Sequence, residues 1–192
     1  MFELIRTLVN AYGATGREKA VSEVIENLVK PYVDTISRDA LGNLICVKKG
    51  TDANGKKIMF SAHMDHIGFI VTGYEKEGFL RVTNVGGIGI DVSLTRHVVF
   101  ANGVEGVVVC EPVQGAKAMK NLFIDIGAES KEEAEELAPI GSVCVFDYQP
   151  VETVGGAMLT PYADDLTACI ALLIAMEELK DQSVENDLYF VF

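Results

Sequence analysis

A change of pattern along the chain most limits how it can fold. Before about residue 67 and after about residue 156, helix-type and strand-type segments alternate, whereas short apolar strands separated by glycines fill the region between. Alternation is typical of an α/β domain, and a run of short strands is typical of a β-barrel or β-sandwich. The strands expected in the middle region are Phe69–Gly73, Phe79–Val85, Val98–Ala101, Gly106–Cys110 and Val143–Phe146.

We therefore expect one α/β domain interrupted by an all-β module. Residues 1–67 are predicted to form the first part of the α/β domain, residues 68–155 the inserted module, and residues 156–192 the second part of the α/β domain. One short helix is expected inside the module. Ser130 and Glu133 have the spacing of a capping box, and the acidic segment behind them runs to Leu137.

The flanking segments carry further local signals. Thr15 and Glu18 form a second capping-box pattern, which predicts the start of a helix that ends before Pro31. The run Lys57–Ala62 is almost wholly apolar, which predicts a strand buried on both faces. Beyond the β module, Leu166–Leu179 predicts a strongly apolar helix.

The chain stops on an apolar strand. Asp187–Phe192 has the composition of a strand at the centre of a sheet, whereas chain ends usually lie at the surface. We expect that the sequence is cut here. Because a last strand with an unpaired edge would pair with another chain, we also expect the isolated chain to associate or to dissolve poorly.

Charge and composition exclude several classes of function. There are 28 Asp and Glu residues against 16 Lys and Arg residues, a formal net charge of −12, which opposes binding to nucleic-acid phosphates. No apolar run approaches the roughly 18 residues of a membrane-spanning helix, and no secretory signal is recognisable. The four scattered cysteines are typical of buried free thiols in a reducing compartment. We expect a cytoplasmic protein with no nucleic-acid or membrane partner.

The first candidate for chemistry is the motif His63-x-Asp65, directly after the apolar Lys57–Ala62 run. In open α/β sheets, ligands bind beyond the carboxyl ends of the strands, so His63 is well placed. Asp65 can accept the second imidazole N–H, which fixes the tautomer of a metal-ligating histidine. The motif therefore indicates a metal ligand with its orienting partner.

The second candidate is the pair Asp164 and Asp165, just before the apolar helix. Both carboxylates could simply cap this helix. Alternatively, one caps the helix while the other points outward and bridges two metal ions, which a two-metal hydrolytic site requires. For the remaining histidines we expect a pocket-lining or surface position for His66 and a structural role for His97.

These residues, taken together, resemble the tetrahedral aminopeptidase family, also called glutamyl or deblocking aminopeptidases, whose members are often labelled endoglucanases. The resemblance runs along all 192 residues and is most specific between Asp125 and Ala134. The segments that carry it are Ala14–Glu18, Asp39–Asn43, Ala62–Asp65 with Gly68 and Phe69, Val85–Gly87, Phe123–Ala128 with Ser130–Ala134, and Ala163–Asp165.

The resemblance implies a phosphorylase/hydrolase-like three-layer α/β/α catalytic domain, incomplete in this chain, with an inserted all-β dimerisation domain. It implies two divalent metal ions, Zn²⁺ or Co²⁺. By position, His63 would be a ligand of one ion, Asp65 its catalytic orienting partner, and Asp164 the bridging carboxylate. It also implies peptide substrates and homo-oligomers, from dimers to twelve-subunit shells.

The sequence departs from the family pattern in three places. His66 stands where members often carry Glu, and Leu166–Ala168 replaces an Arg-x-Gly sequence. A Glu-Glu pair normally follows the strand that ends here at Phe192, its first Glu acting as general base and its second as a metal ligand. Another acidic ligand and a His ligand normally come later. This chain contains none of these downstream groups.

Two functions remain open, with a third disfavoured. The chain is expected to belong to a metal-dependent aminopeptidase that removes N-terminal residues through a water activated by two metal ions, although it lacks the Glu base and the downstream ligands. The alternative is a catalytically inactive fragment or assembly module that keeps the β dimerisation domain. A glycosidase would need two carboxylates beside a sugar-binding cleft, and the chain has no tryptophan for sugar stacking.

Overall fold

The computed structural model describes residues 1–192 as two compact units. One unit comprises Met1–Asp65 together with Gln149–Phe192, and the other comprises His66–Tyr148. The first is a mixed α/β unit and the second is a closed β-barrel, so the prediction of an α/β fold with an inserted β module is confirmed. None of the helices has both the length and the apolarity needed to cross a lipid bilayer.

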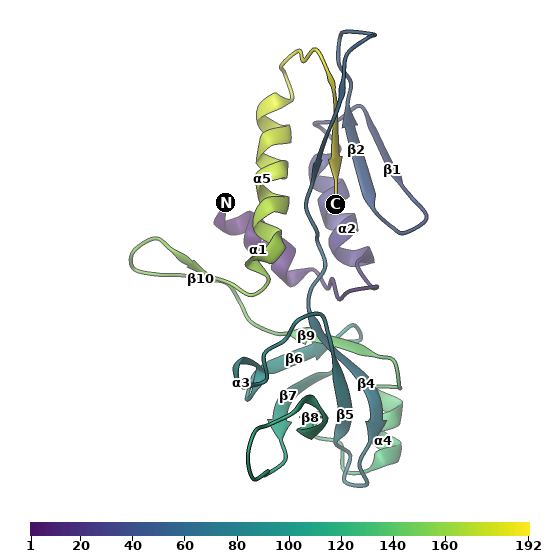
Figure 1. Ribbon diagram of the computed structural model, residues 1–192, viewed down its shortest axis with the longest axis vertical. Helices are drawn as coiled ribbons and strands as arrows, with labels where there is room; N and C mark the ends of the chain where they lie inside the picture. Colours follow the sequence, from purple (N-terminus) through teal and green to yellow (C-terminus); the bar gives the residue numbers. More distant parts are fainter. The chain divides into compact units, whose positions relative to one another are not determined.

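The α/β unit contains a four-stranded sheet in the order β1-β2-β12-β3 (Figure 1). Strand β12 pairs antiparallel with β2 and parallel with β3, with Phe190 opposite both Cys46 and Phe60. The carboxyl ends of β3 and β12 therefore lie at the same edge of the sheet. The strands are β1 (Thr35–Arg38), β2 (Leu44–Lys48), β3 (Lys57–Ser61) and β12 (Asp187–Val191).

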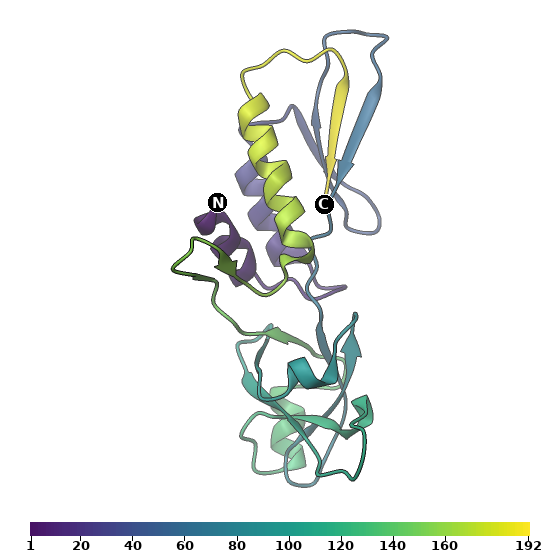
Figure 2. The same cartoon turned by 60° about the vertical axis from the view of Figure 1, so that its left-hand side comes forward.

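Three helices form one layer against this sheet (Figure 2). They are α1 (Phe2–Asn10), α2 (Lys19–Val29) and α5 (Ala163–Leu179). Their apolar faces meet one another and the sheet. The core includes the fully buried side chains Leu8, Ile25, Leu44 and Cys46 together with Phe190, which is 1% exposed. Burial of these apolar faces holds the layer together, because α1 and α2, of 9 and 11 residues, are too short to be stable alone.

Two predictions about strands are corrected by the sheet order. β3 was expected to be buried on both faces, but it is the edge strand and all five of its residues are exposed. An apolar run shows that a strand is suited to burial, but the neighbours that bury it are set by tertiary pairing. β12 does lie inside the sheet, as its composition predicted. The expectation that β12 leaves an edge unpaired is therefore wrong, and that edge belongs to β3.

The capping box predicted at Thr15 and Glu18 is wrong. Helix α2 begins at Lys19 with Glu18 as its N-cap residue, and no side chain caps its first turn. Glu18 Oε1 instead accepts the backbone N–H of Gly16. The hydroxyl of Thr15 donates to Asp65, as described below. The expected stop before Pro31 is correct, since α2 ends at Val29.

The second unit is a closed six-stranded barrel in the order β4-β5-β8-β7-β6-β9 (Figure 1). Every pair of neighbouring strands in the barrel is antiparallel, and the interior is filled by buried apolar side chains such as Phe69, Leu80, Val98 and Ile124. The strands are β4 (Gly68–Tyr74), β5 (Leu80–Val85), β6 (His97–Phe100), β7 (Glu105–Cys110), β8 (Leu122–Asp125) and β9 (Val143–Phe146).

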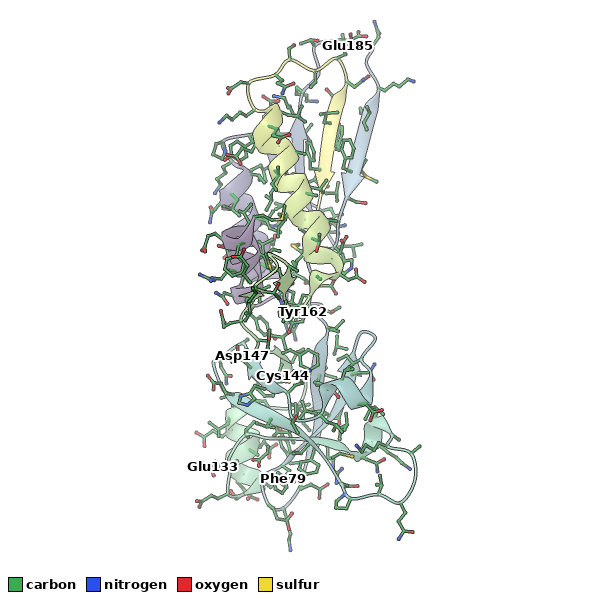
Figure 3. All side chains as sticks on the ribbon, turned by 90° about the vertical axis from the view of Figure 1, so that its left-hand side faces the viewer. Phe79, Glu133, Cys144, Asp147, Tyr162 and Glu185 are labelled. Carbon is green, nitrogen blue, oxygen red and sulfur yellow. The ribbon has the colours of Figure 1, made fainter.

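Five of the barrel strands were predicted, and β8 was not. Of the two hydrogen bonds in the capping box predicted at Ser130, the one accepted by the serine hydroxyl is present. Helix α4 (Lys131–Leu137) begins after Ser130, whose Oγ accepts the backbone N–H of Glu133 at 3.2 Å. The carboxylate of Glu133, labelled in Figure 3, accepts from the N–H of Glu129 at 2.8 Å rather than from Ser130. The carboxylate is thus shifted by one residue from its usual partner.

The remaining elements are short. In the barrel unit they are the four-residue helix α3 (Ile90–Ser93) and the 3₁₀ turn η1 (Met119–Asn121). In the α/β unit, β10 (Val151–Glu152) and β11 (Met158–Leu159) form a separate two-stranded hairpin ahead of α5.

Candidate metal centre

His63 lies two residues beyond the end of β3, at the sheet edge where β3 and β12 both end. Asp164 comes from the start of α5, 101 positions later in the chain. The structure brings the two side chains together, with His63 Nε2 at 3.1 Å from Asp164 Oδ1. The edge of the sheet and the first turn of a helix therefore supply an imidazole and a carboxylate to the same small volume.

The other imidazole nitrogen of His63 is held by Asp65. His63 Nδ1 lies 2.9 Å from Asp65 Oδ1, the arrangement in which a carboxylate orients a histidine toward a metal. The second oxygen of the same carboxylate, Asp65 Oδ2, accepts a hydrogen bond from the Thr15 hydroxyl at 2.6 Å. Thr15, Asp65, His63 and Asp164 thus form one continuous chain of polar contacts.

The charges of this chain of contacts shift the pKa values of its members. Partial burial disfavours the imidazolium, but the hydrogen bonds to Asp164 and Asp65 outweigh burial and raise the pKa of His63 above 6.5. Burial also opposes ionisation of Asp65, but the hydrogen bonds from Thr15 and His63 outweigh it and lower the pKa of this carboxyl. The two carboxylates thus favour positive charge at His63, which a metal cation would also supply.

The two adjacent aspartates are held differently. Asp165 Oδ1 accepts the backbone N–H of Ala168 at 3.3 Å, which caps the first turn of α5. The Asp164 side chain is 96% exposed and reaches His63. The peptide bond between them is cis, and Tyr162, which is labelled in Figure 3, has a left-handed backbone. Of the two interpretations of the pair, the contacts to Ala168 and His63 favour one capping carboxylate and one outward-pointing carboxylate.

A cavity of about 460 Å³ opens beside His63. Its lining includes the acidic side chains of Glu18, Asp65 and Asp165 and the apolar residue Phe192. The cavity therefore combines negative charge with an apolar wall at the carboxyl edge of the sheet, where α/β sheets bind their ligands.

The donor set fits a divalent metal ion in part. Imidazole nitrogen and carboxylate oxygen are ordinary ligands of Zn²⁺, and the Nδ1 contact of His63 to Asp65 is the usual support of such a ligand. No group of three or more His, Cys, Asp or Glu side chains in the chain is placed to hold a metal. His63 and Asp164 are thus two potential ligands, fewer than the three protein ligands of typical catalytic zinc sites.

The other histidines lie elsewhere. His66 belongs to the barrel unit and is 1% exposed, so the expected surface position is wrong. His97 is the exposed first residue of strand β6 in the barrel. Sequence reasoning missed Thr15 as a member of the site. The only local signal was its place in a turn before a helix, and that signal favoured capping instead.

Comparison with known proteins identifies the family. The M42 glutamyl aminopeptidase family matches residues 42–192, and the chain belongs to this family. A protein of Acetivibrio thermocellus is 41% identical over 197 residues, an alignment that covers 100% of this chain and 57% of the relative.

Solved structures agree with this assignment. An aminopeptidase from the archaeon Desulfurococcus kamchatkensis superposes with a TM-score of 0.90 at 34% identity, covering 99% of this chain and 54% of that one. The Pyrococcus horikoshii TET1 peptidase, described as assembling into a tetrahedron or a large octahedral shell, gives a TM-score of 0.87 at 34% identity and coverages of 99% and 59%. The chain thus spans a little over half the length of the proteins it matches.

Proposed function

We propose that this chain is part of a metal-dependent aminopeptidase that removes N-terminal residues from peptides. In this proposal His63 and Asp164 are metal ligands, Asp164 bridges two divalent ions, Zn²⁺ or Co²⁺, and Asp65 orients His63. The observation that carries the proposal is the 3.1 Å approach of His63 Nε2 to Asp164 Oδ1 while Nδ1 is already engaged by Asp65. Membership of the M42 glutamyl aminopeptidase family supports the reaction class.

Two residues of this chain would have supporting tasks. Asp65 accepts a hydrogen bond from His63 Nδ1–H and thereby keeps the Nε2 lone pair directed toward Asp164. Asp165 caps α5 and so holds the adjacent Asp164 beside His63. When bound, divalent ions would contribute Lewis acidity, which polarises a scissile carbonyl and lowers the pKa of water. The general base and the further ligands would come from the part of the relatives that this chain does not span.

The cavity suits the free amine of a peptide. Glu18, Asp65 and Asp165 line it, and the chain has a net charge of −12, so a positively charged α-amino group is attracted there. An amine docked at one end of a closed site restricts cleavage to the first residue. Within this proposal, residues 1–67 and 156–192 contribute the catalytic domain, and residues 68–155 form a dimerisation domain.

The proposal extends to assembly and location. The likeness to the Pyrococcus horikoshii TET1 peptidase, which can assemble into a tetrahedron or a large octahedral shell, supports a homo-oligomer. The four free cysteines support a reducing, cytoplasmic location.

A second function is favoured by one observation, the absence of a third potential ligand beside His63 and Asp164. On this alternative the chain is an assembly module that binds other copies through its barrel and has no turnover. Loss of a general base alone would lower the rate about 10²–10⁴-fold, and loss of ligands would weaken metal binding as well.

Zinc binding by this chain separates the two functions. A titration in competition with a chromophoric chelator is expected to show a saturable site that weakens at least tenfold in His63→Ala and in Asp164→Asn. His97→Ala, which removes a histidine from the barrel, is the matched control and should leave the affinity unchanged. Equal zinc affinity in all four proteins would contradict the proposed ligands and support the assembly module.

Activity provides the second test. The protein expressed from its complete reading frame is expected to hydrolyse amino-acid anilides, to lose this activity when a chelator removes divalent metal, and to recover it with Zn²⁺ or Co²⁺. Hydrolysis that survives complete metal removal would contradict the proposed metal-dependent aminopeptidase.

A further inference from the structure

The contact between Thr15 and Asp65 is not explained by the folding of helix α2. A threonine in a capping box would direct its hydroxyl at the first turn of its own helix, but α2 has no side-chain cap. The Thr15 hydroxyl instead donates to Asp65 Oδ2, 50 residues away in the sequence, at 2.6 Å. A short hydrogen bond to an ionised carboxylate is among the stronger kinds of hydrogen bond.

A tight turn presents Thr15 to Asp65. The backbone N–H of Arg17 donates to the carbonyl of Ala14 at 2.7 Å, which closes a β-turn with Thr15 and Gly16 at its centre. Gly16 has a φ of +78°, while Thr15 is not among the residues with positive φ, which is the arrangement of a type II turn. The carboxylate of Glu18 accepts the Gly16 N–H and fastens the turn from its other side.

The position of the Asp65 carboxylate matters because Asp65 and Asp164 compete for the single N–H of neutral His63. Neutral imidazole has one N–H, and it can be given to Asp65 from Nδ1 or to Asp164 from Nε2, since the two contacts are 2.9 Å and 3.1 Å. Only the first choice leaves Nε2 with a lone pair. The Asp164 side chain is 96% exposed, whereas Asp65 is fixed through its second oxygen by Thr15.

We propose that Thr15 is a positioning residue: by holding Asp65, it selects the tautomer of His63 that carries its proton on Nδ1 and leaves Nε2 free for a metal ion. This inference rests on the proposed function for its purpose. The selection of the tautomer is a property of the metal-free chain and can be measured without metal.

The test compares hydroxyl-bearing and hydroxyl-free side chains at position 15. Thr15→Val keeps the shape and removes the hydroxyl, Thr15→Ala removes it without the branched side chain, and Thr15→Ser restores it. Thr7→Val is the matched control, because the Thr7 hydroxyl donates a hydrogen bond within its own helix, to the carbonyl of Glu3 at 2.7 Å. Circular dichroism and thermal unfolding check that each variant is folded.

The first readout is the pair of imidazole ¹⁵N chemical shifts of His63, recorded in the metal-free chain at a pH where the ring is neutral. In the wild type, Nδ1 is expected to be protonated and Nε2 unprotonated. In Thr15→Val and Thr15→Ala the two shifts should converge, as a mixture of tautomers requires. Thr15→Ser and Thr7→Val should resemble the wild type.

The second readout is zinc affinity. We expect Thr15→Val to weaken binding about three- to tenfold, less than the roughly 10–100-fold typical for loss of a ligand's direct partner, because Thr15 acts through Asp65. Thr15→Ser should restore the affinity to within about twofold. A defect in Thr15→Ser equal to that in Thr15→Val would indicate a merely structural role and overturn the inference.

One further outcome is independent of any variant's folding and of the proposed function. A wild-type His63 that carries its proton on Nε2 overturns the inference directly. If the wild-type chain binds zinc no better than His63→Ala, the proposed ligand role fails, while the nitrogen shifts still show whether Thr15 selects the tautomer.

Discussion

At the scale of single residues, the site depends on how each carboxylate is held. Asp164 and Asp165 are neighbours with the same side chain, yet one caps a backbone N–H and the other reaches a histidine. Asp65 uses its two oxygens for two different partners, His63 and Thr15. The chemistry of a residue here follows from what its atoms contact rather than from its type.

Replacing Asp65 should therefore weaken a metal site without removing a ligand. In Asp65→Asn the amide can accept at only one of the two positions, and the negative charge that supports the Nδ1–H of His63 is lost. We expect zinc affinity to fall about 10–100-fold. Competition with a chelator measures this change. Asp125→Asn is the control, because Asp125 bonds the N–H of Gly127 in the barrel, and an equal loss there would contradict the prediction.

The cysteines should differ sharply in reactivity. Burial raises the pKa of Cys46 to about 11 and those of Cys144 and Cys169 to about 12, whereas Cys110 is only half-buried. Because the thiolate is the reactive form, the thiols of Cys46, Cys144 and Cys169 should react slowly in the folded chain. A disulfide reagent at mildly alkaline pH is expected to modify one thiol rapidly and all four after denaturation. Rapid modification of two or more would count against this burial pattern.

At the scale of elements, strand β12 is attached to the loop between β2 and β3 by a side chain. Asp187, its first residue, accepts the backbone N–H of Gly50 at 2.9 Å and contacts Lys49 Nζ at 3.2 Å. Gly50 and Gly55 are suited to this place, because a Cβ at either would lie under 3 Å from the carbonyl oxygen of Glu185. The connection toward β12 can thus approach the loop only where side chains are absent.

This attachment predicts a pH dependence of stability. The N–H of Gly50 and the ammonium of Lys49 lower the pKa of Asp187 below its unfolded value near 3.8. The stabilisation is therefore fully present above that unfolded value and is lost as the pH falls through the lower, folded value. Urea unfolding of Asp187→Asn should show reduced stability at neutral pH and a difference from wild type that disappears in strong acid.

Asp181→Asn, in the connection between α5 and β12, is the control for this experiment. It should leave the pH profile of unfolding unchanged, because the Asp181 side chain is exposed. A difference between Asp187→Asn and wild type that grows toward low pH would contradict the assigned sign.

At the scale of the whole molecule, one chain forms two separate cores. The α/β core is assembled from segments that precede and follow the barrel in the sequence. Strand β12 and helix α5 therefore join strands β1, β2 and β3 across an intervening segment, residues 66–148. The barrel closes on itself and has no free strand edge, whereas the sheet ends in the exposed strand β3. Any edge-driven association must therefore start from the α/β unit.

The exposed edge predicts how the isolated chain associates. Met59, at the centre of β3, is 68% exposed beside an unpaired strand edge, a combination that favours pairing with another chain. Met59→Lys should therefore increase the fraction of the smallest species in sedimentation velocity at a given concentration. Val92→Lys is the control, since Val92 is similarly exposed on the barrel unit. An equal effect of both substitutions would indicate non-specific apolar association instead.

Much of the fold and part of the site could be predicted from local patterns. The inserted β module, the start of α4 after Ser130, the inner position of β12 and the pairing of His63 with Asp65 depend on residues close in sequence, whose spacing reports periodicity, capping and strand ends directly. β8 (Leu122–Asp125) was missed although it is as long as β6 and β9, which were predicted, so length does not explain the miss. Its pairing with β5 and β7 is a tertiary feature that defines it as a strand.

Other features depended on tertiary structure. The sequence alone determined that His63-x-Asp65 follows a strand and that an aspartate pair precedes a helix. Only folding decided that Asp164 meets His63 across 101 positions and that β3 lies at an edge of the sheet. Folding also decided that the Thr15 hydroxyl donates to Asp65 instead of capping a helix. The physical reason is range: capping and periodicity act over a few residues, whereas strand order and long-range hydrogen bonds depend on which surfaces meet when the chain packs.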